Sequence, residues 1–502
     1  MNGRNRRDFL KLSTAALTAA SLGKIERASA TSEPAATRRP KPMAHGTMSR
    51  SANDPQAGEA LMAGVAQVDI TPPPGLVMYG YESRINNNIV TTGTLDPLYA
   101  RVLVLAMGNT RLALVTLDLG RVYGKPLLDE IQRSARQNDN ISDLVVTASH
   151  THSGPNILDI YSPGQTPEWE TDQIHKIETA IGRACEKLVP VRVGAGYGSC
   201  FIGFNRIELM RSRNTTKVPT APVDPTVGVV RIDTMDGTPL AILVNYACHT
   251  TIFGGTNLKY SADWPGVMIN TVEQAFGGKP ICFFLQGACG DINPYYSDST
   301  PESDDVSDCH WTGETLGHET IRVAQGIQTI STSTPSLQSA EDVLRVKLRW
   351  NPVEFRDGLL SRFGPKVFED HADLMVNEPV PYLEMPVTTW MVDKQIAFAC
   401  MPGEPFVDFQ IEWRTRCPVR NPFFMGYTNG YFDYIPTVEA ASKGGYGAGD
   451  SNTYVEVGTG ERFVLQSVIR TYGFLGGWYE LPKDLRGPTA GALPSNRYLQ
   501  KT

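Results

Sequence analysis

The sequence lacks the cysteine spacing of a structural zinc site, since none of its eight cysteines belongs to a C-x-x-C pair. Cys248, Cys282 and Cys400 lie in apolar runs, where cysteine behaves as a small buried hydrophobe. A framework of disulfides is therefore not expected, and only an individual bridge is compatible with the pattern.

The chain also lacks an excess of basic residues. Its 502 residues include 46 Lys and Arg against 53 Asp and Glu. Residues 1–30 hold six basic and two acidic side chains, so the remainder has 40 basic and 51 acidic residues and a net charge of −11. A nucleic-acid partner is not expected, because binding to a polyanion needs a basic surface.

Long apolar runs are missing as well. A membrane-spanning helix needs about 20 apolar residues, so no transmembrane segment is expected. The first thirty residues carry the twin arginine Arg6-Arg7, a short apolar run (12–22) and the small residues Ala28-Ser29-Ala30. This pattern resembles a bacterial twin-arginine (Tat) signal peptide and predicts a periplasmic or secreted protein exported by the Tat machinery. Residues 31–60 are rich in Ala, Pro, Ser, Thr and Arg and predict a disordered linker.

The rest of the chain has the pattern of a globular α/β protein. The whole sequence is 41% apolar and 20% charged, which is typical of a protein with a substantial core. Period-2 and apolar runs predict strands over 64–70, 100–107, 111–118, 144–150, 191–197, 227–233, 239–246, 281–285, 343–349, 388–392 and 395–399. Helical periodicity covers 126–137, 168–188, 264–276, 313–328, a stretch after 404, and 461–472. Interleaved helices and frequent hairpins predict one layered domain, residues 61–502, around a mixed β-sheet with flanking helices.

Residues 147–155 (Thr-Ala-Ser-His-Thr-His-Ser-Gly-Pro) continue from a predicted buried strand, and Gly154-Pro155 ends it. Residues two apart in an extended backbone point the same way, so His150 and His152 are expected to converge on one site. That geometry suits a metal or a polarised carbonyl. On its own, the motif fits a pair of surface or capping histidines equally well.

His249 and Glu404 also follow predicted buried strands. Ligands of α/β proteins collect at the carboxyl ends of strands, and two imidazoles with a carboxylate would make an open zinc site. Taken singly, His249 fits a hydrogen-bonded core histidine, and Glu404 fits a residue beside a helix N-terminus, where the dipole favours a carboxylate. Only the joint pattern favours the metal site.

This joint pattern resembles the N-terminal catalytic domain of the neutral/alkaline (non-lysosomal) ceramidase family. Seven short motifs occur in the family's order over almost all of the chain after the export signal. They are Asp69-Ile70-Thr71-Pro72-Pro73, Thr147 through Pro155, Phe204-Asn205-Arg206, Asn245 through Thr250, Gly287 through Pro294, Pro402-Gly403-Glu404 and Tyr434-Ile435-Pro436-Thr437.

The resemblance implies a zinc-dependent amidohydrolase with Zn²⁺ as its cofactor. The four zinc ligands of the family fall on His150, His249, Glu404 and Tyr434. Read without the resemblance, Tyr434 also fits a buried tyrosine whose hydroxyl simply needs a hydrogen-bond partner.

The same resemblance places His152 and Arg206 beside the carbonyl of the substrate. Zinc lowers the pKa of its bound water to about 7, so hydroxide is available at neutral pH. We expect that hydroxide to attack an amide or ester carbonyl while zinc, His152 and Arg206 stabilise the oxyanion, each donor typically contributing a few kcal/mol.

One family motif departs from its usual form. The Gly-Asp-x-Ser-Pro motif, whose serine has been assigned a catalytic role, has Asn293 in place of the serine here. An amide can donate a hydrogen bond to an oxyanion but cannot act as a nucleophile, so serine-dependent steps are excluded. Asp291 in the same motif fits a residue that orients its loop, and equally a simple turn former.

The chain is also short after Tyr434, so the family's C-terminal immunoglobulin-like domain is expected to be absent. A glycine-rich loop at 444–449 lacks the strand–helix context of a phosphate loop and is expected to form a flexible rim. These departures from the family pattern affect the prediction of the substrate more than the prediction of the metal site.

The expected function is therefore an exported zinc hydrolase that cleaves the amide bond of a ceramide-like or other N-acylated substrate, small or lipid-like. One alternative is the same centre acting on an ester, lactone or carbohydrate-derived substrate, and another is a catalytically silent binding homologue. A metal-dependent TIM-barrel hydrolase would need a lysine and more histidines at later strand ends, where His310, His318 and His371 do not lie.

Overall fold

The computed structural model describes most of the chain after residue 59. The described residues are 60–158, 161, 165–208, 221–297, 305–351, 353, 357, 382–449 and 452–477. All of them belong to one compact unit, residues 50–502. The predicted export signal (1–30) and all but the last residue of the predicted linker (31–60) lie outside the described residues, so both stay predictions.

Eight strands form one mixed sheet. In their order across the sheet they are β11 (Ile281–Gln286), β9 (Pro239–Tyr246), β8 (Thr226–Thr234), β6 (Val189–Ser199), β1 (Met62–Asp69), β3 (Tyr99–Met107), β4 (Thr110–Leu117) and β5 (Asp143–Ala148). The pairs β11–β9 and β4–β5 are parallel, and the other neighbours are antiparallel. The prediction of an α/β fold around a mixed sheet is confirmed.

A second sheet has four strands. They are β13 (Leu337–Val346), β14 (Leu383–Val392), β15 (Ile396–Cys400) and β17 (Asn421–Met425), of which β15 and β17 run parallel. Three pairs of very short strands complete the described β-structure: β2 (Gly93–Thr94) with β10 (Lys259–Tyr260), β7 (Gly203–Asn205) with β12 (Ile292–Pro294), and β16 (Glu404–Pro405) with β18 (Tyr434–Ile435).

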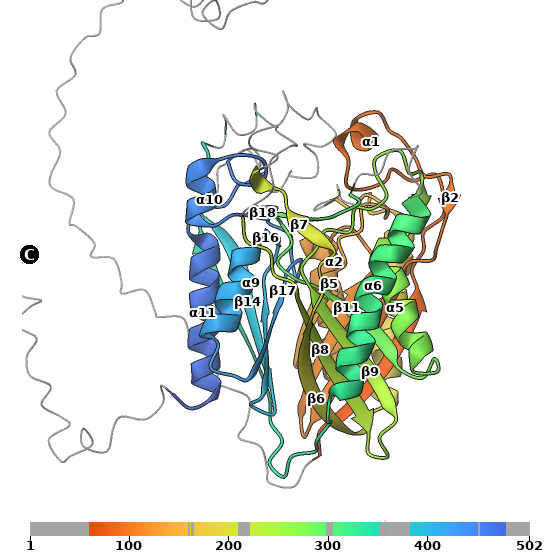
Figure 1. Ribbon diagram of the computed structural model, residues 1–502, viewed down its shortest axis with the longest axis vertical. Helices are drawn as coiled ribbons and strands as arrows, with labels where there is room; N and C mark the ends of the chain where they lie inside the picture. Colours follow the sequence, from red (N-terminus) through yellow and green to blue (C-terminus); the bar gives the residue numbers. More distant parts are fainter. Residues whose placement is uncertain are drawn as a thin grey trace, which may run out of the picture. The chain divides into compact units, whose positions relative to one another are not determined.

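Helices cover the outer faces of the two large sheets. The described helices are α1 (Glu82–Asn86), α2 (Lys125–Asp139), α3 (Glu168–Glu186), α5 (Asp263–Ala275), α6 (Asp305–Gly326), α9 (Val407–Arg416), α10 (Val438–Lys443) and α11 (Thr459–Phe474). Pairs α2–α3 and α5–α6 pack on the eight-stranded sheet, and α9 and α11 pack on the second sheet (Figure 1). None of these helices combines the length and the apolar character needed to cross a bilayer.

Residue alternation along the strands builds the layers. On β3, Leu103 and Leu105 face the second sheet and share a core with Phe398 of β15. Val102 and Val104 point the other way, into the core beneath α2 and α3. Because β3 is buried on both faces, its residues 102–107 form an unbroken apolar run rather than an alternating pattern.

Several element boundaries differ from the predictions. Helix α6 begins at Asp305, eight residues before the predicted start, because its first turns are polar and lack an apolar period. Strand β13 ends at Val346, although it was predicted to reach residue 349. Strand β17 was not predicted, since Pro422 argues against a central strand. It is an edge strand, where a missing N–H is tolerated.

The eight-stranded sheet curls so that its two edge strands, β5 and β11, meet. Gln286 at the end of β11 is fully buried, and its Nε2 donates to the carbonyl oxygens of Ser149 at 3.0 Å and Cys248 at 2.9 Å. Thr250 Oγ1 donates to the same Ser149 carbonyl at 2.6 Å. The chain segments that leave β5 and β9 are therefore fastened side by side.

The cysteines are all described, and none forms a disulfide. Cys248, Cys282 and Cys400 are buried, as predicted from their apolar surroundings.

The core between the sheets gives a stability prediction. Leu285 on β11 is fully buried there, and we expect Leu285→Ala to lower the free energy of unfolding by about 2–5 kcal/mol, since the lost side chain leaves a cavity. Leu465 on α11 is 44% exposed, so the control Leu465→Ala is expected to change it by less than about 0.5 kcal/mol. Urea unfolding measures both, and equal losses would contradict the inter-sheet core.

Candidate metal centre

His150 lies in a turn two residues beyond β5. Its backbone is left-handed, with φ 65°, and its amide donates to the Leu119 carbonyl oxygen at 3.0 Å. The expectation of an extended backbone through this motif is therefore wrong. The turn still directs the imidazole inward, where Nδ1 lies 2.7 Å from the Gly120 carbonyl oxygen in the loop after the neighbouring strand β4.

His249 lies three residues beyond β9 and is fully buried. Its Nδ1 lies 3.0 Å from the Ile292 carbonyl oxygen, and its own carbonyl accepts a hydrogen bond from Trp264 Nε1 at 2.9 Å. A carbonyl can only accept, so the Nδ1 atoms of His150 and His249 carry the protons. In the neutral rings, each Nε2 then presents a lone pair.

The three histidines converge, as the joint sequence pattern predicted for His150, His152 and His249. Nε2 of His152 lies 3.2 Å from Nε2 of His150, and one nitrogen from each of the three rings lies within 4.8 Å of the others, a grouping that could hold a metal ion. The His152 ring stands edge-on to Tyr79 and Tyr81, with ring centroids 5.6 and 5.4 Å away.

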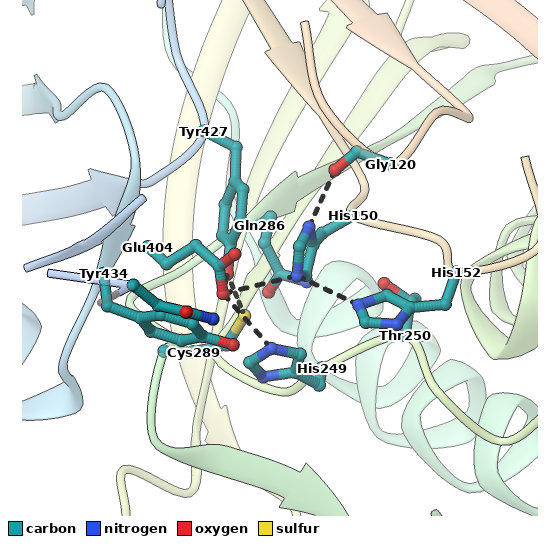
Figure 2. A network of polar contacts seen from close by, with 12 residues as sticks. Gly120, His150, His152, His249, Thr250, Gln286, Cys289, Glu404, Tyr427 and Tyr434 are labelled. Atoms are coloured by element: carbon teal, nitrogen blue, oxygen red, sulfur yellow. Dashed lines mark hydrogen bonds and ion pairs between the residues drawn. The ribbon is translucent and has the colours of Figure 1, made fainter. Parts of the chain in front are cut away.

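Glu404 brings a carboxylate to the same point. Its Oε2 lies 3.4 Å from Nε2 of His150 and 3.4 Å from Nε2 of His249, and Figure 2 shows the carboxylate directed at the two rings. Ligand atoms about 2.0–2.1 Å from a common tetrahedral ion are about 3.3 Å apart. The spacing of these three side chains therefore fits one shared cation.

The protonation states also fit a cation site. Burial lowers the pKa of His249 to about 4, with the nearby Arg206 charge acting in the same direction. Burial likewise lowers the pKa of His152 well below its usual value. Burial alone would raise the pKa of Glu404, but the interactions with His150 and His249 hold it well below its usual value. Neutral imidazoles and an ionised carboxylate are the forms that bind metals.

An unpaired atom supports the same conclusion. Nε2 of His249 is buried and has no hydrogen-bond partner among the described residues. An orphaned buried acceptor is costly, and here it faces the ionised carboxylate of Glu404, which is itself an acceptor. Two acceptors facing each other in a buried site need a proton or a metal ion between them, so the pair is compatible with a bound metal.

Arg206, predicted to contact the substrate, lies beside this cluster on the segment after β7. Its Nη1 donates to Asn293 Oδ1 at 3.0 Å, and its Nη2 donates to the Gly290 carbonyl and to Tyr434 Oη, both at 2.8 Å. Tyr434 is buried, and Figure 2 shows it on the Glu404 side of the cluster. Among the described residues, no hydrogen bond joins Tyr434 to the histidines, so its role as a fourth ligand stays a prediction.

Asn293 and Asp291 make other contacts. The Asn293 amide oxygen accepts from Arg206, and its Nδ2 donates to Ser297 Oγ at 3.3 Å. Asp291 Oδ2 accepts from Asn205 at 2.6 Å, and Oδ1 accepts from the Val407 amide at the start of α9 at 2.9 Å. In this arrangement Asn293 fixes the arginine, and Asp291 orients its loop and a helix terminus.

Several residues of the site were not found by sequence reasoning. The Tyr427 ring lies against the His150 ring, tilted by 31° with centroids 4.3 Å apart, and its hydroxyl donates to Glu404 Oε2 at 3.3 Å. Tyr431 donates to Glu404 Oε1. Both tyrosines belong to the aromatic segment 426–434 after β17. The high tyrosine content of this segment, close to the predicted ligand Tyr434, was the one sequence feature that could have indicated these residues.

The cluster opens into a pocket of about 120 Å³. Its described lining includes five tyrosines, Arg121 and Asn452, and Ile85 is the one aliphatic side chain among them. A larger cavity, about 880 Å³, lies beside α9 and α10 and is lined by Asp291 and several other carboxylates, but by none of the three histidines. The smaller pocket is the one next to the donor cluster, since His150, His152 and Glu404 line it.

Comparisons with known proteins identify the family and the fold. Residues 61–338 match the family described as neutral/alkaline non-lysosomal ceramidase, N-terminal. The crystal structure of neutral ceramidase from Pseudomonas aeruginosa is similar, with a TM-score of 0.65 and 18% identity over 83% of this chain and 74% of that one. A structure titled "Ceramidase complexed with C2" gives a TM-score of 0.67 and 18% identity over 83% of this chain and 76% of that one. At this identity, the structural matches establish the shared fold.

The buried His249 predicts a pH dependence. Its folded pKa of about 4 lies below the unperturbed value of about 6.5, so the unfolded chain binds an extra proton between these values. The unfolding free energy of the metal-free protein should therefore fall as pH drops from about 6.5 to about 4. In the variant His249→Asn, we expect a smaller decrease in the unfolding free energy over this pH range, because the titrating imidazole is gone.

Urea unfolding across this pH range measures the effect. His318 lies exposed on α6, and the control His318→Asn should keep the wild-type profile. Identical profiles for His249→Asn and the wild type would show that His249 is not held neutral.

Proposed function

The chain belongs to the neutral/alkaline non-lysosomal ceramidase family, and on that premise we propose that it is a zinc-dependent amidohydrolase acting on a ceramide-like or other N-acylated substrate. The observation that carries the proposal is the meeting of His150, His249 and Glu404, with 3.4 Å between each nitrogen and the carboxylate oxygen. Hydrolase activity follows from the family, and the metal, the amide bond and the substrate class are the proposed part.

We assign the ligand roles to His150, His249 and Glu404, with Tyr434 as the fourth ligand. When bound, zinc would supply a Lewis acid that activates water and polarises a carbonyl. His152 belongs to the same nitrogen cluster and is the competing fourth donor. Two imidazoles, a carboxylate and one further ligand are an ordinary donor set for zinc.

Arg206 and His152 would act on the substrate carbonyl. The guanidinium is held by the Asn293 amide oxygen and the Gly290 carbonyl, so its position is set before a substrate arrives. His152 Nε2 lies 3.2 Å from His150 Nε2 and so beside the proposed metal position, where a proton carried on that nitrogen would be available to a substrate oxyanion. Fixed donors aimed at a developing oxyanion cost no reorganisation during the reaction.

The donor set gives a metal-binding prediction. We expect the purified protein to carry close to one zinc per chain, and His150→Ala and His249→Ala to lose both the metal and the activity. If Tyr434 is the fourth ligand, His152→Ala keeps the zinc and loses most of the activity, whereas loss of zinc in this variant would make His152 the ligand. Elemental analysis after dialysis measures this, and a zinc-free wild type would refute the proposal.

The bond that is cleaved needs a separate experiment. We expect turnover of N-acyl amides by the zinc-loaded protein in a panel that also includes esters, lactones and acylated sugars. Turnover confined to the other bonds would replace the amide assignment, and stoichiometric zinc without any turnover would favour a binding homologue. His249→Ala is the blank for contaminating hydrolases.

Export by the twin-arginine pathway is also part of the proposal. Arg6-Arg7, the apolar run and Ala28-Ser29-Ala30 support it. The substrate would then be met in the periplasm or outside the cell.

A further inference from the structure

Phenols approach both oxygens of Glu404, but only the phenol at Oε1 makes a close contact. Tyr431 Oη donates to Oε1, and Tyr427 Oη lies 3.3 Å from Oε2, the oxygen that faces the histidines. Tyr79 Oη lies 2.9 Å from Tyr431 Oη. An ionised carboxylate can only accept hydrogen bonds, so the Tyr431 hydroxyl donates its hydrogen bond to Glu404. In the contact with Tyr79, the Tyr431 oxygen is therefore the acceptor. The chain of donation therefore runs from Tyr79 through Tyr431 to Oε1.

The surroundings keep Tyr431 a donor. Glu404 can only accept when it is ionised, so the contact between Tyr431 Oη and Glu404 Oε1 requires the proton to lie on the phenol. The Arg121 guanidinium lies over the Tyr431 ring, 4.5 Å from its centroid, which fixes the ring and favours a polarised hydroxyl. The Tyr454 hydroxyl donates to the Tyr431 carbonyl at 2.8 Å and holds the backbone.

We propose that Tyr431, oriented by Tyr79, is a positioning residue that occupies Oε1 of Glu404 and leaves Oε2 as the carboxylate's only metal-binding oxygen. The inference rests on the proposed metal centre. It concerns how the carboxylate binds and not whether a metal is present. Groups that orient a ligand from behind typically change metal affinity 10- to 100-fold when they are removed.

The consequence concerns the number of ligand positions. A carboxylate with two free oxygens can bind a metal through both, and the second oxygen would fill a position that a catalytic zinc site keeps for water or substrate. Tyr431 and Tyr79 both line the pocket. The two phenols therefore keep the pocket side of the centre open.

Tyr431→Phe tests the proposal, because it removes one oxygen and keeps the ring. We expect this variant to retain one zinc per chain with about 10- to 100-fold weaker affinity, measured by competition with a chromophoric chelator. With Co²⁺ as the probe, its visible absorption should be weaker than in the wild type, because a second Glu404 oxygen raises the coordination number.

Tyr260→Phe is the matched control. Tyr260 is fully buried, and its hydroxyl makes one hydrogen bond, to the Pro73 carbonyl at 3.3 Å. This variant loses one phenol hydrogen bond that does not touch the metal ligands, so it should keep the wild-type affinity and Co²⁺ spectrum. A change of the same size in both variants would assign the effect to general destabilisation and overturn the proposal.

Tyr79→Phe provides a second test. The one side-chain hydrogen bond described for the Tyr79 hydroxyl is the bond to Tyr431, so this variant should weaken zinc binding less than Tyr431→Phe. In the double variant the Tyr79 change should add nothing, because its partner is gone. Additive losses would overturn the relay.

The outcomes separate the two proposals. A wild type without stoichiometric zinc refutes the metal centre itself. A wild type with zinc, together with a Tyr431→Phe variant of unchanged affinity and spectrum, refutes only the role of Tyr431.

Discussion

One buried amide joins the parts of the chain that make the site. Gln286 donates to the carbonyls of Ser149 and Cys248, the residues directly before His150 and His249. These histidines come from strands β5 and β9, which are far apart in the order of the sheet. Because a buried donor left without its acceptor is costly, the amide holds the two strand ends together. The hydrogen bond from Thr250 to the Ser149 carbonyl acts in the same direction, so the distance between the imidazoles is fixed by several contacts between these segments.

The site is organised by the directions of its acceptors. Carbonyls of Gly120 and Ile292 fix which nitrogen of each imidazole carries the proton, and the remaining lone pairs face the carboxylate of Glu404. These acceptor atoms repel one another unless a positive charge lies between them. The folded chain therefore favours binding of a cation at this point. The phenols around Glu404 and the guanidinium of Arg206 are hydrogen-bond donors that surround the same acceptors. They lie beside the small polar pocket.

The sequence predicted the parts of the fold that depend on local patterns. Apolar runs located most strands within a few residues, and polar residues after those runs located His249 and Glu404. Family motifs added Arg206 and Tyr434. The second sheet could not be separated from the first, because both bury apolar strands of the same kind. Gln286 escaped notice since its role depends on a contact between edge strands.

The tyrosines behind Glu404 were missed for a related reason. They lie in a segment whose backbone is set by left-handed residues such as Asn429 and Asp433, and it follows a strand that Pro422 concealed. Nothing in the local sequence indicates that Tyr431 faces a carboxylate 27 positions away. Contacts of this kind follow from tertiary packing rather than from periodicity.

The left-handed backbone of His150 has a consequence for how this family could drift. A residue with φ 65° carries a steric cost that glycine avoids and asparagine tolerates. At His249 the backbone has no such positive φ, so a lost imidazole could be replaced by many residue types. Descendants that abandon the metal should therefore accumulate Gly or Asn at position 150 and a broad mixture at position 249. This difference between positions 150 and 249 would identify relatives that keep the fold but have lost the metal site.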